Sequence, residues 1–212
     1  MRIIKPYIEL IDAPDYDAML KKIERIGRVC YKSEGKITEN SAEGFVRGII
    51  KRGHESVIEH ASISVLVVCD RGVSHEIVRH RIASYSQEST RYCNYAKDDF
   101  CNVITVIEPC FLVPETEGWY LWQNSCEMAE ASYFDMLAFG CSPQEARSVL
   151  PNSLKTELVM TMNLREWRHF IKLRTSPAAH PQMREVAKII AEDFVRRYPV
   201  FFEDLEGGNG ND

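Results

Sequence analysis

The stretch ISVLVVC, residues Ile63–Cys69, carries the clearest strand signal in the chain. Every second residue from Ile63 onward is apolar, which is the period of a β-strand. The intervening positions also become apolar from Leu66 onward, so both faces of the second half are apolar. We therefore expect a central strand that is covered on both sides.

Outward from this strand, the apolar spacing predicts further strands and several helices. We expect strands over Tyr7–Ile11 and Lys155–Met162, and a strand or extended loop over residues 101–114. The predicted helices are Asp15–Arg28, Asn40–Gly53, Gly72–Ser84, Trp119–Phe139, a short helix after Ser142, Asn163–Arg174 and Gln182–Arg197. Asn40 and Glu43 have the spacing of a capping box, and Gly53 is the expected C-terminal cap of the same helix. Gly140 and Pro151 are expected to end the two helices that precede them.

The predicted strands are few and do not alternate regularly with the helices. This order favours an α+β fold in which helices pack around a small central sheet. We expect a single domain over residues 1–205. The tail EGGNGND, residues 206–212, has no residues to bury and is predicted to be disordered.

Composition excludes several classes of protein. The formal net charge of −5 argues against a general nucleic-acid coat, which needs a broad basic field. The apolar run at Ile63–Val68 is far too short to span a bilayer, and the first residues lack signal-peptide features, so we expect a cytoplasmic protein. The seven cysteines form no Cys-x-x-Cys pair, so we expect reduced thiols and no metal site.

Against this acidic background, RHRIASYSQESTRY (Arg79–Tyr92) gathers cations and hydroxyls. Guanidinium groups bind phosphates through paired, charge-assisted hydrogen bonds, and nearby hydroxyls add donors. A solvated basic turn is the alternative interpretation. No glycine-rich phosphate loop is present, so arginines and hydroxyls would have to hold any nucleotide.

A second basic feature lies in NLREWRHFIKLR, residues 163–174. On a helix, Arg165, His169 and Lys172 form a stripe opposite the apolar residues, while Glu166 points elsewhere. Because acids do not alternate with these cations, the pattern favours an anionic ligand over a solvated face. Arg147 leaves two possibilities open: a buried arginine would need an acid or a ligand, and an exposed one would need neither.

The motifs HESVIEH, SHEIVRHRIAS, SQESTRY, ARSVLP, NLREW and FIKLR occur in this order along most of the chain. Together they resemble the flavin-dependent thymidylate synthases, with Arg79, His80, Arg81 and Ser89 in the position of that family's signature. The resemblance implies methylation of dUMP, with methylenetetrahydrofolate as carbon donor, FAD as hydride carrier and NADPH as reductant, and no protein nucleophile. It also implies a homotetramer with active sites shared between chains, and no nucleic-acid or membrane partner.

The resemblance also implies roles for individual residues. Arg174 would be catalytic and would favour the ionised uracil. The implied FAD contacts are Ser56, Glu59, Arg79, His80, Arg81, Ile82, Gln87, Asn163, Leu164, Arg165 and His169. The implied dUMP contacts are Glu76, Ile77, Val78, Arg79, Gln87, Glu88, Ser89, Thr90, Arg91, Arg147 and Arg174.

One other function remains open from the residues. A non-catalytic nucleotide- or RNA-binding module could use the same arginines, with the interleaved tyrosines stacking on bases. A zinc hydrolase built on His54, His60 and His80 is not expected, because their spacing does not match the helical His-Glu-x-x-His motif.

Overall fold

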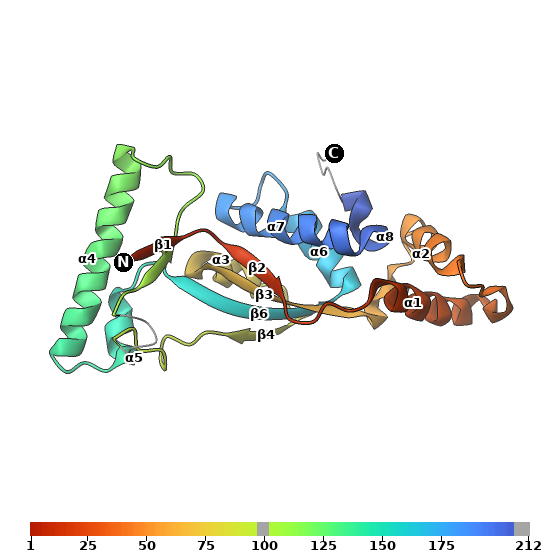
Figure 1. The fold of residues 1–212 in the computed structure, drawn as a ribbon, viewed down its shortest axis with the longest axis horizontal. Coiled ribbons are helices and arrows are strands. Elements are labelled where there is room, and N and C mark those ends of the chain that lie inside the picture. Colours follow the sequence, from red (N-terminus) through yellow and green to blue (C-terminus); the bar gives the residue numbers. More distant parts are fainter. Residues whose placement is uncertain (97–101, 206–212) are drawn as a thin grey trace. The chain divides into compact units, whose positions relative to one another are not determined.

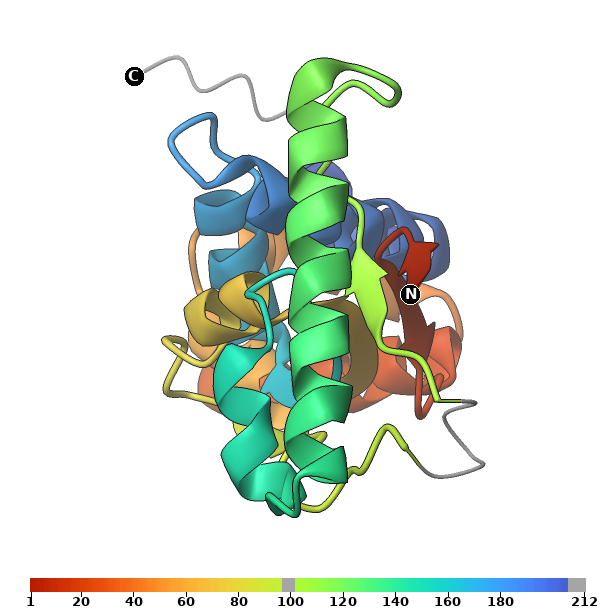
Figure 2. The ribbon, with the colours of Figure 1, turned by 90° about the vertical axis from the view of Figure 1, so that its left-hand side faces the viewer.

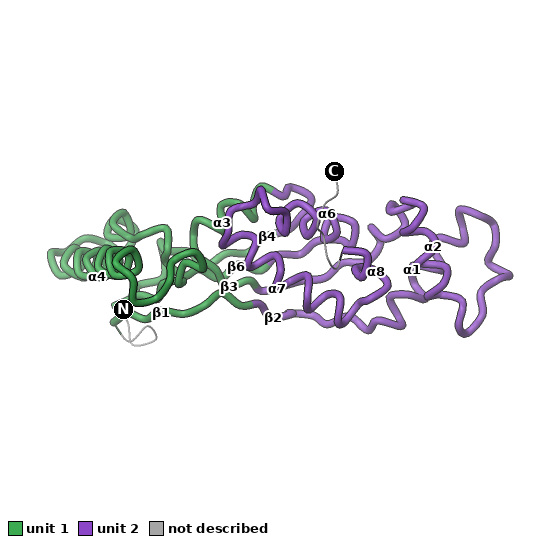
Figure 3. Tube along the Cα trace, turned by 90° about the horizontal axis from the view of Figure 1, so that it is seen from above, with its two compact units in different colours: residues 1–7, 67–79, 85–159 green, residues 8–66, 80–84, 160–212 purple. Residues whose placement is uncertain are grey.

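The structure is a computed structural model that describes residues 1–96 and 102–205. Figure 3 shows the two units into which it divides: unit 1, residues 1–7, 67–79 and 85–159, and unit 2, residues 8–66, 80–84 and 160–212. The predicted tail and part of the predicted strand over residues 101–114 lie outside the described residues. Among the described residues, none of the helices is both long and apolar enough to span a lipid bilayer.

Figure 1 shows the order of strands and helices along the chain. The strands are β1 (Arg2–Ile4), β2 (Tyr7–Leu10), β3 (Ser62–Asp70), β4 (Ser84–Gln87), β5 (Thr105–Ile107) and β6 (Lys155–Asn163). The helices are α1 (Tyr16–Tyr31), α2 (Ser41–Lys51), α3 (Arg71–Ile77), α4 (Glu117–Ala138), α5 (Pro143–Ala146), α6 (Leu164–Arg174), α7 (Pro181–Arg197) and α8 (Pro199–Phe202). Short 3-10 helices are η1 (Glu34–Lys36), η2 (Glu55–His60), η4 (Arg147–Val149) and η5 (Glu203–Leu205).

The main sheet has the strand order β2-β3-β6-β4, so β3 is an interior strand, as its sequence predicts. The strand predicted over Lys155–Met162 is β6, and its alternate residues Leu158, Met160 and Met162 are buried. The α+β class is confirmed by these strands and the helices between them. The prediction of one domain over residues 1–205 stays a prediction.

Unit 1 has its own apolar core. The parallel pair β1–β5 aligns Ile3 with Val106, and Val106 also bridges to Leu154. Tyr133 of α4 and Tyr95 pack their rings edge to face within this core. Figure 2 shows α4 along its full length with α5 beside its C-terminal end.

Unit 2 is a set of helices around a second apolar core. Helix α6 packs against α7, and α7 packs against α8. Trp167 of α6 is fully buried against Phe194 of α7, and its indole N–H donates to the carbonyl of Ile63. This bond holds α6 on the chain that enters β3, and so places the polar side of α6.

Two expectations at helix ends are wrong. Asn40 precedes α2 but makes no side-chain cap; instead the Ser41 hydroxyl accepts the Thr38 N–H. The helix predicted over residues 72–84 ends at Ile77. The Tyr85 hydroxyl donates to the Ile77 carbonyl, which satisfies an end-of-helix acceptor while the chain turns into β4.

Candidate functional site

A cavity of about 510 Å³ lies in unit 2 beside the polar side of α6, and we call it the α6 pocket. Its walls come from η2, the segment after His80, and α6 itself. The residues that line it are Glu55, Glu59, Ile82, Asn163, Arg165, Glu166, Arg168, His169 and Lys172. Five of them belong to the FAD set implied by the resemblance: Glu59, Ile82, Asn163, Arg165 and His169.

Local chemistry fixes where α6 begins. Asn163, the last residue of β6, has an extended backbone, and its side-chain oxygen accepts the N–H of Glu166. This is the N-cap that an asparagine favours, and it satisfies one of the free N–H groups of the first turn. The strand therefore passes directly into the helix, and Arg165, Glu166 and His169 follow at fixed angular positions.

The expectation that no acid neutralises the basic stripe is wrong for Arg165. Its Nη1 lies 2.6 Å from Oε1 of Glu59, and Glu55 is a second, more distant partner. These acids come from η2, about a hundred residues earlier in the chain, so the helical spacing of α6 could not reveal them. Both Arg165 and Glu59 remain largely exposed.

Arg168 is a pocket residue that the sequence analysis missed. Its guanidinium is buried and donates to the Phe201 carbonyl at 2.5 Å, to both carboxylate oxygens of Asp204 at 2.6 Å, and to Glu55 at 3.0 Å. It joins the C-terminal segment of unit 2 to the pocket wall. The sequence does contain a signal for this buried position, because Arg168 lies on an otherwise apolar face of the helix.

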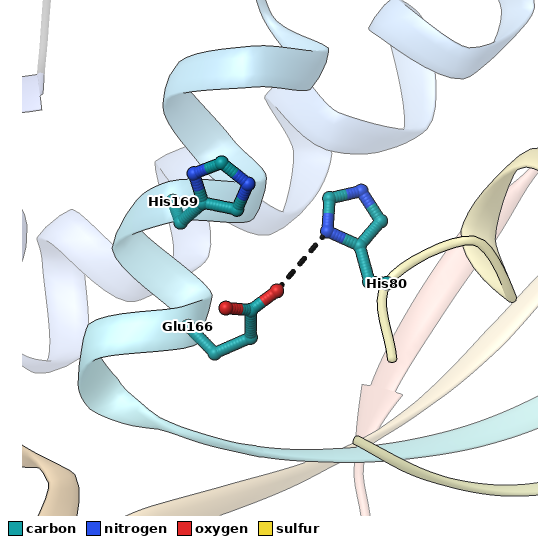
Figure 4. Close-up of side chains that lie close together, drawn as sticks. All are labelled: His80, Glu166 and His169. Carbon is teal, nitrogen blue, oxygen red and sulfur yellow. Dashed lines mark hydrogen bonds and ion pairs between the residues drawn. The ribbon is translucent and has the colours of Figure 1, made fainter. Parts of the chain in front are cut away.

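His80 is buried beside the pocket and joins two residues of α6. Figure 4 shows its ring directed at Glu166, with Nδ1 3.2 Å from Oε1. The Nε of Arg174 donates to Nε2 of His80 at 3.0 Å. The expectation that Glu166 points away from the basic stripe is wrong, because Glu166 lines the same pocket and contacts His80.

The environment of His80 favours the neutral form of its ring. Burial is the main cause that lowers the pKa of His80, and the charge of Arg174 lowers it further, whereas Glu166 opposes both. Arginine has hydrogens but no acceptor, so Nε2 must be the unprotonated nitrogen. The ring hydrogen is therefore on Nδ1, and His80 donates it to Glu166.

His80, Glu166 and His169 are the one cluster with metal-ligand spacing in the described residues. It differs from the set proposed for a zinc hydrolase, because neither His54 nor His60 belongs to it. The His54 Nδ1 instead lies 2.6 Å from the Tyr31 hydroxyl. Both ring nitrogens of His80 already take part in hydrogen bonds, so a metal ion would have to displace one of them.

A second cavity, of about 480 Å³, lies in unit 1, and we call it the Arg147 pocket. Its lining residues are Arg71, Thr90, Gln144, Arg147, Ser148, Leu150, Pro151, Asn152 and Leu154. Arg147 is exposed, and its Nη1 donates to the Thr90 hydroxyl at 3.2 Å. The pocket thus brings together two residues of the implied dUMP set.

Arg71 is the second arginine of the Arg147 pocket and was also missed. Its Nη1 is buried and has no hydrogen-bond partner within the described part of the chain. The nine lining residues include two arginines and no carboxylate. This wall suits an anion that accepts hydrogen bonds.

Three further residues of the implied ligand contacts lie in unit 1 and are held by side-chain contacts. The Gln87 amide donates to Ser74 and Thr156, and the Glu88 carboxylate accepts from Lys155 at 3.1 Å. The Arg91 guanidinium lies 5.5 Å from the ring centre of exposed Tyr92.

Other predicted contacts line neither pocket. Ile77 and Leu164 are fully buried, so neither is exposed to a ligand. The remaining side chains are exposed or half-buried: Ser56, Glu76, Val78, Arg79, Arg81 and Ser89. Arg79 belongs to unit 1 and His80 belongs to unit 2, so the boundary between the two units falls between two adjacent residues of the Arg79–His80–Arg81 signature.

Several known proteins are similar to this chain in sequence. The family described as "Thymidylate synthase complementing protein" matches residues 9–200. The chain is 34% identical over 168 residues to a flavin-dependent thymidylate synthase of Pyrococcus furiosus, covering 76% of this chain and 66% of the relative. It is 35% identical over 210 residues to a flavin-dependent thymidylate synthase of Mycobacterium tuberculosis, covering 91% of this chain and 82% of the relative.

A solved structure is also similar. The UMP/dUMP methylase PolB from Streptomyces cacaoi, bound with 5-Br dUMP, superposes with a TM-score of 0.77 at 25% identity. The match covers 96% of each chain.

Proposed function

Because the chain belongs to the family of flavin-dependent thymidylate synthases, we propose that it converts dUMP to dTMP, with methylenetetrahydrofolate as carbon donor, NADPH as reductant and FAD supplying the hydride. The observation that carries the proposal is the α6 pocket, which gathers five of the FAD contacts implied by the sequence.

The donor set of the α6 pocket fits a flavin dinucleotide. Arg165, His169 and Lys172 are donors for a diphosphate, and Ile82 is an exposed apolar side chain for a ring. The carboxylates of Glu55 and Glu59 can accept from ribityl or ribose hydroxyls. Exposed ion pairs contribute little to stability, so Arg165 can exchange Glu59 for a phosphate at small cost.

We assign the dUMP phosphate to the Arg147 pocket. Thr90 and Arg147 already form one hydrogen-bonded pair there, and the absence of carboxylates among the lining residues avoids repulsion of a phosphate. The PolB relative, named as a UMP/dUMP methylase and bound with 5-Br dUMP, supports a uridine nucleotide as substrate. That name also makes UMP a second candidate substrate.

Arg174 provides the electrostatic part of the reaction in this proposal. A fixed cation beside the uracil stabilises the negative charge that develops on the ring, and it needs no reorganisation during the reaction. Its Nε is already held by His80, so the guanidinium is oriented before substrate binds. None of the cysteines needs to act as nucleophile.

We further propose a homotetramer with active sites shared between chains. Light scattering of the purified protein measures its mass. If sites are shared, mixing a variant that is inactive through a residue of the α6 pocket with one that is inactive through a residue of the Arg147 pocket should restore part of the activity.

The first experiment is the visible spectrum of the purified protein, followed by anaerobic addition of NADPH and then of dUMP with methylenetetrahydrofolate. We expect an oxidised-flavin spectrum that bleaches with NADPH, and formation of dTMP. UMP in place of dUMP tests the second substrate. A colourless protein that also fails to take up FAD would refute the proposal and favour the nucleotide-binding module.

The matched variant is Arg174→Ala. It should retain flavin and its bleaching by NADPH but lose most methyl transfer, because Arg174 does not line the α6 pocket. Full activity in this variant would show that Arg174 has a different role.

A further inference from the structure

We infer that Glu166 is a positioning residue for Arg174 and acts through the ring of His80. The inference rests on the role proposed above for Arg174 in methyl transfer. Neither the sequence signature nor the resemblance assigns Glu166 to the site.

The first observation is a stripe on α6. Glu166, Phe170 and Arg174 are spaced by four residues, so they lie on one face of the helix. All three contact His80: Glu166 at Nδ1, Arg174 at Nε2, and Phe170 with its ring centre 4.9 Å from the imidazole centre. Side chains on a helix lean toward its N-terminus, so the long Arg174 side chain reaches back toward Glu166.

The second observation is the direction of the two hydrogen bonds. Arg174 can only donate, so it requires a lone pair on Nε2. Glu166 is a carboxylate and accepts, so it requires the hydrogen on Nδ1. Both bonds exist together in only one form of the neutral ring, and each of them selects that form.

The third observation is that Glu166 is itself held in place. Its backbone N–H is bonded to the Asn163 side chain at the start of the helix, and its carboxylate is mostly buried. His80 is also buried, and its ring packs on Phe170 and lies 5.8 Å from the ring of His169. The ring is therefore clamped between two positions of one helix.

Without the Glu166 acceptor, the His80 ring could adopt either of its two neutral forms. The other neutral form places a hydrogen on Nε2, where it would face the Nε hydrogen of Arg174. Two donors repel, so the guanidinium would leave its position. Glu166 can thus affect the reaction without touching the substrate.

The test compares Glu166→Met, which removes the acceptor, with Glu166→Gln, whose amide oxygen can still accept. We expect Glu166→Met to lower kcat about 10- to 100-fold, the range for loss of a hydrogen bond to a charged group. The KM for dUMP should change far less than kcat, and Glu166→Gln should recover most of the loss. Glu192→Met, which changes an exposed glutamate of α7, is the matched control.

Nitrogen-15 NMR of the histidine ring gives a readout that does not depend on activity. In the wild type we expect His80 to carry its hydrogen on Nδ1, with the signal assigned by comparison with His80→Asn. In Glu166→Met we expect a mixture of the two forms. If the wild type carries the hydrogen on Nε2, or if Glu166→Met keeps a wild-type kcat, the inference is wrong. If the wild type makes no dTMP, the proposed function fails, whereas the NMR result still decides the ring form.

Discussion

The contribution of Arg168 to the stability of the protein can be worked out from its contacts. The change is Arg168→Met, which keeps the length and apolar stem of the side chain and removes the guanidinium. It deletes the bonds to Phe201, Asp204 and Glu55, which join α6 to the C-terminal segment and to η2.

The loss of stability depends on whether each former partner of Arg168 can form a hydrogen bond with water instead. The Phe201 carbonyl has lost a donor in a buried position, which costs about 1–3 kcal/mol. Asp204 is nearly half exposed and Glu55 is a quarter exposed, so water re-solvates them and they add about 1 kcal/mol at most. We expect the free energy of unfolding to fall by roughly 1–4 kcal/mol, or about 2–16 °C in Tm for a protein of this size.

Thermal and urea unfolding followed by circular dichroism measure this difference. The control is Arg196→Met, because Arg196 is 70% exposed and pairs with Asp193 of its own helix. We expect the control to stay within about 0.5 kcal/mol of the wild type. Equal effects of the two variants would refute the buried network as a source of stability.

The pH dependence gives a second check of the same network. Burial tends to raise the pKa of Asp204, but the hydrogen bonds and charge of Arg168 outweigh it, so this pKa lies below the usual 3.8. The contribution of Asp204 is therefore fully present above pH 3.8 and is lost as the pH falls through the lowered pKa. The stability gap between wild type and Arg168→Met should narrow over that range.

Three further outcomes are expected. Arg71→Met should weaken binding of dUMP about 10-fold or more by calorimetry and leave deoxyuridine binding unchanged, because only the phosphate needs the arginine; equal losses for both ligands would contradict this. Methyl transfer should decline as the pH falls from 6.5, the ordinary pKa of histidine, through the lowered pKa of His80, because a hydrogen on Nε2 displaces Arg174. The stability that depends on the lowered pKa of His80 is likewise present above pH 6.5 and is lost as the pH falls through that pKa. A flat kcat profile from pH 8 to 5 would contradict this prediction. Gly27→Ala should lower stability by about 1–3 kcal/mol in urea unfolding, because its Cβ would lie 2.6 Å from the ring of Phe45, and an unchanged midpoint would show that the ring moves freely aside.

Much of the fold follows from local sequence. The alternation at Ile63–Cys69 predicts an interior strand, and β3 is one. The periodicity of residues 163–174 predicts a helix with Trp167 in the core, and Trp167 is buried. These features are predictable because hydrophobic period and capping act between residues that are close in the chain.

Local pattern was least reliable at the ends of helices. Residues 72–84 read as one helix, yet the Tyr85 hydroxyl takes the Ile77 carbonyl and the chain turns into β4. The predicted Asn40 cap is likewise absent, and the Ser41 hydroxyl accepts the N–H of Thr38, which precedes the helix. A side chain that competes for the same backbone group has no fixed place in a periodic pattern.

The sequence by itself determined the family, the chemical types gathered in its motifs and the helix that carries the basic stripe. Only the tertiary structure decided which of these groups meet. Glu59 neutralises Arg165 from about a hundred residues away, Arg168 is buried against the C-terminal segment, and His80 is clamped by Glu166 and Arg174. Hydrogen bonds and ion pairs depend on distances of about 3 Å, and those distances between remote segments exist only once the apolar cores have packed.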